Sequence, residues 1–158
     1  MRIIAIDPGL ERVGIAILDK ERGGKETLVF SECFKTKSSL SLSERLNLIG
    51  GHLNETILEY RPEALAIESL FFTTNQKTAM VVSQARGVII YEGAKNNLFI
   101  YEYTPLQIKV AVTGYGKATK TQVDSMVQKL ITISKKIKSD DEMDAVAIGL
   151  TCFACIRN

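Results

Sequence analysis

The amino-acid sequence predicts an α/β protein with a mixed, five-stranded sheet that is flanked by helices on both faces. Two observations indicate this fold class. Residues 1–36 hold three apolar runs separated by Gly, Pro and charged residues, a pattern that is typical of short antiparallel strands. Beyond residue 40, apolar residues at helical spacing alternate with short continuous apolar runs, as in layered α/β domains.

The first three strands are predicted over Arg2–Asp7, Val13–Leu18 and Thr27–Thr36. An Asp-Pro-Gly turn ends the first strand, and a Gly-Gly pair precedes the third, because glycine and proline favour tight turns. Strands joined by such short connections are expected to pair as an antiparallel meander.

A helix is predicted after Ser41, where apolar residues begin to recur every three or four positions. Ser41 and Glu44 have the spacing of a capping box, which satisfies free backbone N–H groups at a helix start. Pro62 ends this helix. Ala64–Glu68 then reads as a short buried strand with a carboxylate at its end.

The rest of the chain alternates between helices and one further strand. We predict a helix over Gln76–Lys95, a strand over Leu98–Tyr103, a short helix opened by Pro105, a helix over Thr119–Ile133, and a last helix from Ser139 to about Ile156. Ser139 and Glu142 predict a second capping box. Residues 1–158 show no linker or repeat, so we expect a single domain, which is usual for this length.

Composition excludes several classes of protein. Hydrophobic residues make up 46% and charged residues 24% of the chain, which is ordinary for a globular domain and unlike a disordered one. No signal peptide or membrane span is predicted, and three cysteines suggest no disulfide framework, so we expect a cytoplasmic protein. The Cys152-x-x-Cys155 pair suits a metal or redox site, but with a single histidine, His52, we favour two buried thiols.

Four carboxylates fall where the predicted elements end or begin. Asp7 and Glu68 end the first and fourth predicted strands, while Asp141 and Asp144 lie in the first turn of the last helix. If the two strands are parallel neighbours, their carboxylates meet at one sheet edge, where open α/β sheets place their sites. A spacing of three residues puts Asp141 and Asp144 on one helix face.

Together these residues predict a metal-dependent active site. Asp7, Glu68, Asp141 and Asp144 offer only oxygen ligands, which suit Mg²⁺ or Mn²⁺. Two such ions can activate a water and stabilise the leaving oxygen in phosphodiester cleavage. Each residue also has an ordinary alternative role: a turn aspartate, a solvent-facing glutamate, or two helix-capping aspartates. Their joint placement favours the active site.

A basic segment precedes the acidic cluster. Residues 105–138 contain seven lysines and one acidic residue, although the whole chain has a net charge of only +2. We predict that this lysine-rich segment, which includes Lys109, Lys117 and Lys120, draws a nucleic-acid backbone toward the carboxylates that follow it. Phe71 and Phe72 follow Glu68 in a predicted loop, where an exposed ring can stack on an unpaired base. Core packing remains the alternative, chiefly for Phe72.

The chain resembles the RuvC family of Holliday junction resolvases, which have a ribonuclease H-like fold. The resemblance covers nearly the whole chain and rests on an ordered set of motifs: Ile6-Asp7-Pro8-Gly9, Ala66-Ile67-Glu68-Ser69-Leu70-Phe71-Phe72, Gln84-Ala85-Arg86-Gly87, Tyr103-Thr104-Pro105-Leu106-Gln107-Ile108-Lys109, Gly114-Tyr115-Gly116-Lys117-Ala118-Thr119-Lys120 and Asp141-Glu142-Met143-Asp144-Ala145. Asp-x-Gly after a first strand is weak by itself, but the ordered set is specific.

The resemblance implies a homodimeric endodeoxyribonuclease that binds four-way junction DNA and nicks two opposing strands symmetrically. It implies that Asp7, Glu68, Asp141 and Asp144 form a catalytic tetrad that holds Mg²⁺, expected as two ions, with Mn²⁺ able to substitute. It further implies base stacking by Phe71, basic contacts near the scissile strand from Lys109 and Lys120, and dimerisation through the helix that starts at Gln76. RuvA and RuvB are the implied partners.

Three other functions are compatible with parts of the sequence. A nuclease acting on RNA–DNA hybrids would share the fold and the carboxylates. A catalytically silent junction-binding module would share the basic surface. An actin-like ATPase also begins with Asp-x-Gly but needs two domains around its nucleotide, for which 158 residues are too few.

Overall fold

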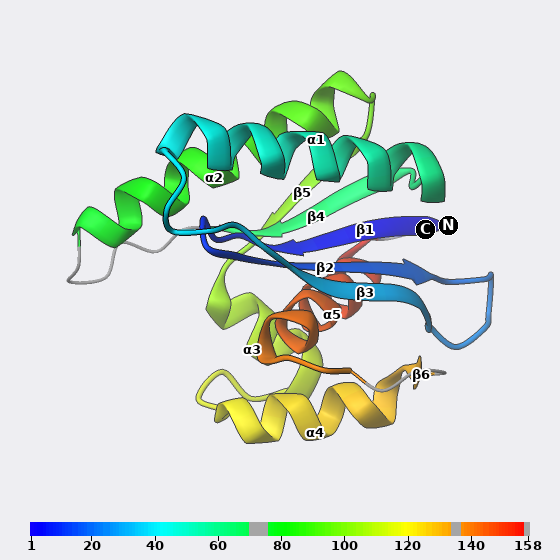
Figure 1. Cartoon of the computed structure of the whole chain (residues 1–158). Helices are drawn as coiled ribbons and strands as arrows, with labels where there is room; N and C mark the ends of the chain where they lie inside the picture. Colours follow the sequence, from blue (N-terminus) through cyan, green and yellow to red (C-terminus); the bar gives the residue numbers. More distant parts are fainter. Residues whose placement is uncertain (70–75, 134–136, 157–158) are drawn as a thin grey trace.

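The computed structural model describes residues 1–69, 76–133 and 137–156. In these ranges a single mixed sheet has the strand order β5-β4-β1-β2-β3-β6. Helices cover both of its faces, with α1 and α2 on one side and α3, α4 and α5 on the other (Figure 1). The predicted α/β class and the five predicted strands are confirmed, and a short sixth strand is added.

The first three strands form the predicted meander. β1 (Arg2–Asp7) pairs antiparallel with β2 (Arg12–Asp19), which pairs antiparallel with β3 (Thr27–Lys35). β4 (Ala64–Glu68) lies parallel to β1 on its other side, and β5 (Phe99–Tyr103) lies parallel to β4. The carboxyl ends of β1, β4 and β5 therefore share one edge of the sheet.

The sixth strand replaces the end of a predicted helix. α4 (Lys120–Leu130) stops at Leu130, and β6 (Thr132–Ile133) then pairs in parallel with the start of β3. The prediction of a helix through Ile133 is wrong at this end. Two β-branched residues in succession favour extended backbone, and the edge of β3 was available for pairing.

The first three helices begin where the sequence predicts. α1 (Leu42–Tyr60) has the predicted capping box of Ser41 and Glu44. α2 (Gln76–Lys95) and α3 (Pro105–Thr113) start where predicted. In Figure 1 the first turns of α2 extend well past the sheet. Among the described residues no helix is long and apolar enough to cross a membrane.

The start of α5 (Asp140–Cys155) differs in detail from the expectation. Ser139 Oγ accepts from the Glu142 backbone N–H at 3.3 Å, as in a capping box. The Glu142 carboxylate, however, accepts from Ser31 Oγ at 2.7 Å and from the Lys138 backbone N–H at 3.3 Å. The box is therefore only half formed, because the buried Glu142 is drawn to β3.

The cysteine prediction is half right. Cys152 is buried, whereas Cys155 is exposed. Cys155 is the last residue of α5 and lies beyond the buried stretch that ends at Phe153.

The core has one layer on each side of the sheet. Ile4 and Ile6 of β1 face α1 and α2, whereas Ile3 and Ala5 face α5. The α5 side carries small residues, and a Cβ added at Gly149 of α5 would lie 3.2 Å from the Cβ of Ala5. These small contacts let α5 lie close against the middle of the sheet, which positions its first turn beside the end of β1.

Candidate active site

Asp7 and Glu68 lie side by side because β1 and β4 are parallel neighbours. The register pairs Ile6 with Ile67, so each carboxylate follows at the next position. Alternation along β1 places Asp7 on the α5 side with Ile3 and Ala5. The same alternation places Glu68 on that side. The sequence prediction that these strands bring two carboxylates together is confirmed.

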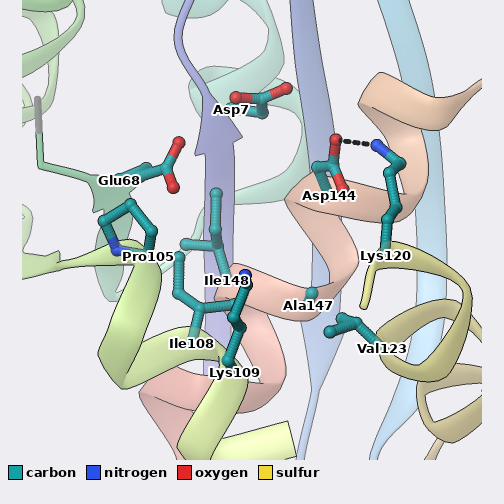
Figure 2. Close-up of a pocket in the computed structure, with 10 residues that line it drawn as sticks. All are labelled: Asp7, Glu68, Pro105, Ile108, Lys109, Lys120, Val123, Asp144, Ala147 and Ile148. Atoms are coloured by element: carbon teal, nitrogen blue, oxygen red, sulfur yellow. Dashed lines mark hydrogen bonds and ion pairs between the residues drawn. The ribbon is translucent and has the colours of Figure 1, made fainter. Parts of the chain in front are cut away.

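α5 adds a third carboxylate to a shared cavity. Asp7, Glu68 and Asp144 line a cavity of about 250 Å³, and Lys109 of α3 and Lys120 of α4 complete its charged lining (Figure 2). The remaining lining is largely apolar and comprises Pro105, Ile108, Val123, Ala147 and Ile148. Five elements distant in sequence thus converge on one charged cavity.

The two lysines of the cavity differ in their contacts. Lys120 Nζ donates to Asp144 Oδ2 at 2.6 Å. Burial lowers the pKa of Lys120, but the bond to Asp144 outweighs it, so the pKa is raised and the ammonium stays charged. Figure 2 shows Lys109 extending from α3 toward the space between the carboxylates.

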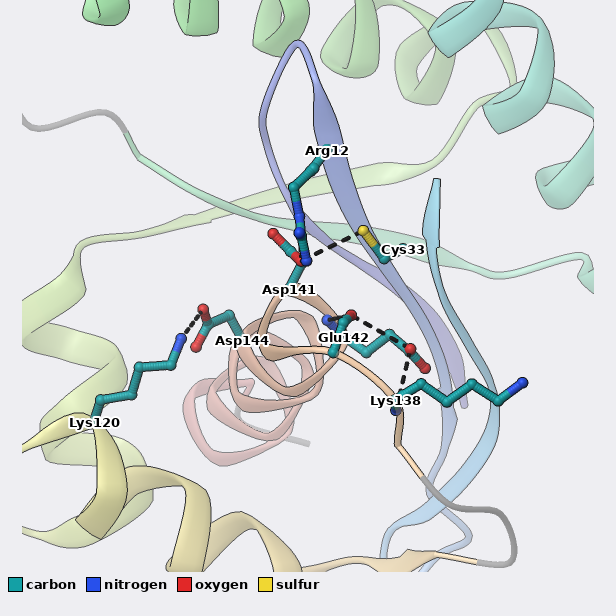
Figure 3. A network of polar contacts seen from close by, with 8 residues as sticks. Arg12, Cys33, Lys120, Lys138, Asp141, Glu142 and Asp144 are labelled. Carbon is teal, nitrogen blue, oxygen red and sulfur yellow. Dashed lines mark hydrogen bonds and ion pairs between the residues drawn. The ribbon is translucent and has the colours of Figure 1, made fainter. Parts of the chain in front are cut away.

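Asp141 shares the start of α5 with Asp144 but does not line the cavity. Arg12 Nε donates to Asp141 Oδ2 at 2.9 Å, and a second guanidinium N–H forms an ion pair with the same oxygen (Figure 3). Cys33 Sγ donates to Oδ2 at 3.4 Å. Burial raises the pKa of Asp141, but the bonds from Arg12 and Cys33 outweigh this, and the pKa is lowered.

The pKa values of the two strand carboxylates, for which the described residues offer no ion pair, are shifted in the opposite direction. Burial, followed by repulsion from Asp144, Glu68 and Asp141, raises the pKa of Asp7 from 3.8 to about 7. Burial and then repulsion from Asp144 also raise the pKa of Glu68. The cavity therefore concentrates more negative charge than Lys120 compensates, which is the condition that a bound cation relieves.

The chemistry of the four carboxylates fits a hard divalent cation, although the four are not grouped around one point. Within the described residues, no three carboxylate, histidine or cysteine side chains are grouped as metal ligands. Two of the four predicted ligands, Asp141 and Asp144, are held by Arg12 and Lys120 instead. Carboxylate oxygens are the ligands that Mg²⁺ and Mn²⁺ prefer, so the chemistry of the set fits these ions.

Gly14 of β2 allows the start of α5 to approach the sheet. Its register partner on β1 is Asp7. A Cβ added at Gly14 would lie 2.0 Å from the backbone oxygen of Asp141 and 3.1 Å from the Cβ of Asp7. A side chain at this position would therefore separate the two acidic elements.

Arg86 supports the end of β4 from the opposite face. Its Nε donates to the backbone oxygen of Glu68 at 3.1 Å, and its guanidinium also forms an ion pair with Glu102 of β5. The sequence pattern alone indicates no function for Arg12, Cys33 or Arg86. Arg12 lies in the same hairpin as Asp7, so its sequence position could have indicated a place near the site. Nothing in the sequence near Cys33 indicates its contact with Asp141.

The remaining predicted site residues do not line the cavity. Lys117 is exposed between α3 and α4, away from the cavity lining. Phe71 and Phe72 lie outside the described residues. The predicted base-stacking role therefore stays a prediction.

Comparison with known proteins identifies one family. The family model described as "Crossover junction endodeoxyribonuclease RuvC" matches residues 3–152. A protein of that name from Fusobacterium nucleatum subsp. nucleatum is 44% identical over 151 residues, which cover 96% of this chain and 79% of the relative. Its namesake from Caldicellulosiruptor saccharolyticus is 44% identical over 150 residues, 95% of this chain and 90% of the relative.

Solved structures agree with the sequence comparisons. Thermus thermophilus RuvC, in a complex with a Holliday junction substrate, superposes with a TM-score of 0.89 at 30% identity, and the match covers 96% of this chain and 92% of that chain. The yeast mitochondrial Holliday junction resolvase Ydc2 matches with a TM-score of 0.73 at 12% identity over 96% of this chain and 77% of that chain, which indicates a shared fold.

Proposed function

Because this chain belongs to the RuvC family of crossover junction endodeoxyribonucleases, we propose that it resolves four-way DNA junctions by paired, symmetric nicks in opposing strands. The observation that carries this proposal is the cavity in which Asp7, Glu68 and Asp144 meet Lys109 and Lys120. Carboxylates and ammonium groups in one cavity suit the hydrolysis of a charged phosphodiester. The whole chain, residues 1–158, would act as a single nuclease domain.

Asp7, Glu68, Asp141 and Asp144 are the proposed catalytic residues and the proposed ligands of Mg²⁺, with two ions in each active site and Mn²⁺ as a substitute. The raised pKa values of Asp7 and Glu68 support this role, because a bound cation would offset both causes, which are burial and then repulsion from neighbouring carboxylates. Bound metal would supply an activated water and stabilise the charge that develops on the leaving oxygen. The chain itself supplies the rigid strand ends and helix start that orient the carboxylates.

The lysines provide the proposed contacts to DNA. Lys120 stays protonated beside Asp144 and can pass its N–H donors to a phosphate near the scissile bond. Lys109 extends into the same cavity, and Lys117 is exposed on the adjoining turn. Phe71 is proposed to stack on an unpaired base, with Phe72 as its neighbour in the segment that follows Glu68.

The proposed assembly is a homodimer that works with the branch-migration proteins RuvA and RuvB. Paired nicks in opposing strands require two active sites on one junction. α2 offers apolar side chains for such an interface, since Met80 and Tyr91 are each more than 60% exposed.

A nicking assay tests the proposal. Purified protein with Mg²⁺ is expected to cut a labelled, mobile four-way junction into symmetric nicked duplexes, and to leave linear duplex and RNA–DNA hybrid uncut. Asp7→Asn is expected to lose cleavage but to keep junction binding, because the basic surface is unchanged. Glu55→Gln, on the exposed face of α1, makes the same change of charge away from the site and serves as the control.

Each contrary result has a definite meaning. Cleavage by Asp7→Asn at the wild-type rate would refute the assignment of the carboxylates. Preferential cutting of the hybrid would keep the active site but change the substrate. Tight junction binding without nicks, in Mg²⁺ and in Mn²⁺, would identify a binding module.

A further inference from the structure

We propose that Arg12 is a positioning residue that holds the Asp141 carboxylate by hydrogen bonds and competes with divalent metal for it. This inference rests on the proposed function, because it assumes that the carboxylates take up a divalent cation. Binding of the metal through Asp141 Oδ2 then requires that the guanidinium gives up that oxygen.

The contacts around Asp141 carry the argument. Two N–H groups of Arg12 and the thiol of Cys33 all donate to the same atom, Asp141 Oδ2. An oxygen that accepts several hydrogen bonds has its lone pairs occupied, so it is a poor metal ligand until donors leave. Arg12 therefore competes with a cation directly at Oδ2, and at Oδ1, which takes part in none of these contacts, through the repulsion between its positive charge and the metal.

Arg12 is placed so that it can leave. Its side chain is 47% exposed, whereas that of Asp141 is 20% exposed. Arg12 also lines a groove with Arg45 of α1 and Val81 of α2, which gives the guanidinium room away from the carboxylates. Ion pairs with this much solvent exposure are weak, so a divalent cation is able to displace the arginine.

The arrangement of charge explains why such a residue would be useful. Asp141 is paired with Arg12 and Asp144 with Lys120, whereas no ion pair to Asp7 or Glu68 is found among the described residues. Without these pairs the helix start would bring two more bare charges toward a buried aspartate. Arg12 thus stabilises the metal-free protein and weakens metal uptake.

The test measures Mn²⁺ binding by isothermal titration calorimetry on the full chain without DNA. Arg12→Gln is expected to bind Mn²⁺ roughly three- to tenfold more tightly than wild type, because both the competing pair and the repulsion between guanidinium and metal are lost. Arg45→Gln is the matched control. Arg45 lines the same groove, but its Nε donates to Thr36 Oγ1 at 2.8 Å rather than to one of these carboxylates.

Further variants separate competition from bulk charge. Arg12→Lys keeps the charge but loses the forked contact, so its Mn²⁺ affinity is expected to lie between those of wild type and Arg12→Gln. Equal or weaker Mn²⁺ binding by Arg12→Gln would overturn the inference, as would an equal gain in Arg45→Gln. If wild type binds no Mn²⁺ and Glu68→Gln behaves identically, the proposed metal site itself fails.

Discussion

Single residues of the site differ in how their charge is compensated. Arg12 and Lys120 form ion pairs with Asp141 and Asp144 of α5. Asp7 and Glu68 of the strands have no such ion pair among the described residues. Asp7 bears the largest consequence, because burial and three neighbouring carboxylates together raise its pKa to about 7. Repulsion among these carboxylates destabilises the folded protein, and it is retained because the reaction needs the carboxylates close together.

The raised pKa of Asp7 makes the stability of the metal-free protein depend on pH. The folded pKa is about 7 and the ordinary value is 3.8, so between these values the folded state binds a proton that the unfolded state releases. Stability relative to Asp7→Asn should therefore fall as pH rises from about 4 to about 7 and stay constant above, by roughly 1–3 kcal/mol in total.

Urea unfolding of both proteins in a chelator, measured between about pH 4 and pH 8, checks this expectation. Glu55→Gln on the exposed face of α1 provides the control, and its difference from wild type should not follow the same course. A constant stability difference between wild type and Asp7→Asn would show that Asp7 is ionised throughout.

At the scale of elements, the site depends on how closely α5 approaches the sheet. Gly14 permits this approach where β2 passes beneath the Asp141 backbone. Alanine residues on β1 and β4 permit it further along. The carboxylates of α5 consequently depend on small residues of the sheet for their position.

Gly14→Ala is expected to push the start of α5 away from β1. The added Cβ meets a backbone oxygen at 2.0 Å, which no side-chain rotation can relieve. We expect a loss of about 1–3 kcal/mol in the free energy of unfolding, and slower junction cleavage than that loss alone explains.

Gly51→Ala in α1 is the matched control for this substitution. Nothing lies within 4 Å of an added Cβ at Gly51, so alanine should stabilise the helix by up to about 1 kcal/mol. Urea unfolding and the nicking assay measure both variants. Wild-type stability and cleavage in Gly14→Ala would show that α5 adjusts freely.

For the whole molecule, the proposed homodimer must place two active sites on one junction. The first turns of α2 extend beyond the sheet, near the end of the sheet that carries the site (Figure 1), and Met80 and Tyr91 of this helix are exposed. An interface there would couple the two cavities through a shared rigid helix.

Met80→Glu is expected to weaken dimerisation by about tenfold or more, because a charge would enter an apolar contact. Sedimentation velocity over a range of concentrations measures the change. Leu58→Glu on α1 provides the matched control, since Leu58 is 61% and Met80 64% exposed. If both variants dimerise as wild type does, α2 is not the interface.

Much of this molecule follows from the sequence by itself, because the deciding interactions are local. The capping box of Ser41 and Glu44 fixes where α1 begins, Pro105 marks the start of α3, and a short apolar run fixes β4. Parallel pairing then accounts for the meeting of Asp7 and Glu68. The helix starts and β4 depend on hydrogen bonds and periodicities within a few residues. The pairing of β1 with β4 joins strands that are far apart in the chain, so the sequence predicts the meeting of Asp7 and Glu68 only if those strands are neighbours.

Only the tertiary structure decided the rest. Arg12 and Asp141 are 129 residues apart in the chain, and Ser31 and Glu142 are 111 apart. The half-formed capping box, the edge strand β6 and the pairing of Asp141 all arise where a distant group outcompetes the local partner. A carboxylate at a helix start is satisfied equally well by a backbone N–H, a metal or an arginine, and packing of the whole chain determines which of them is near.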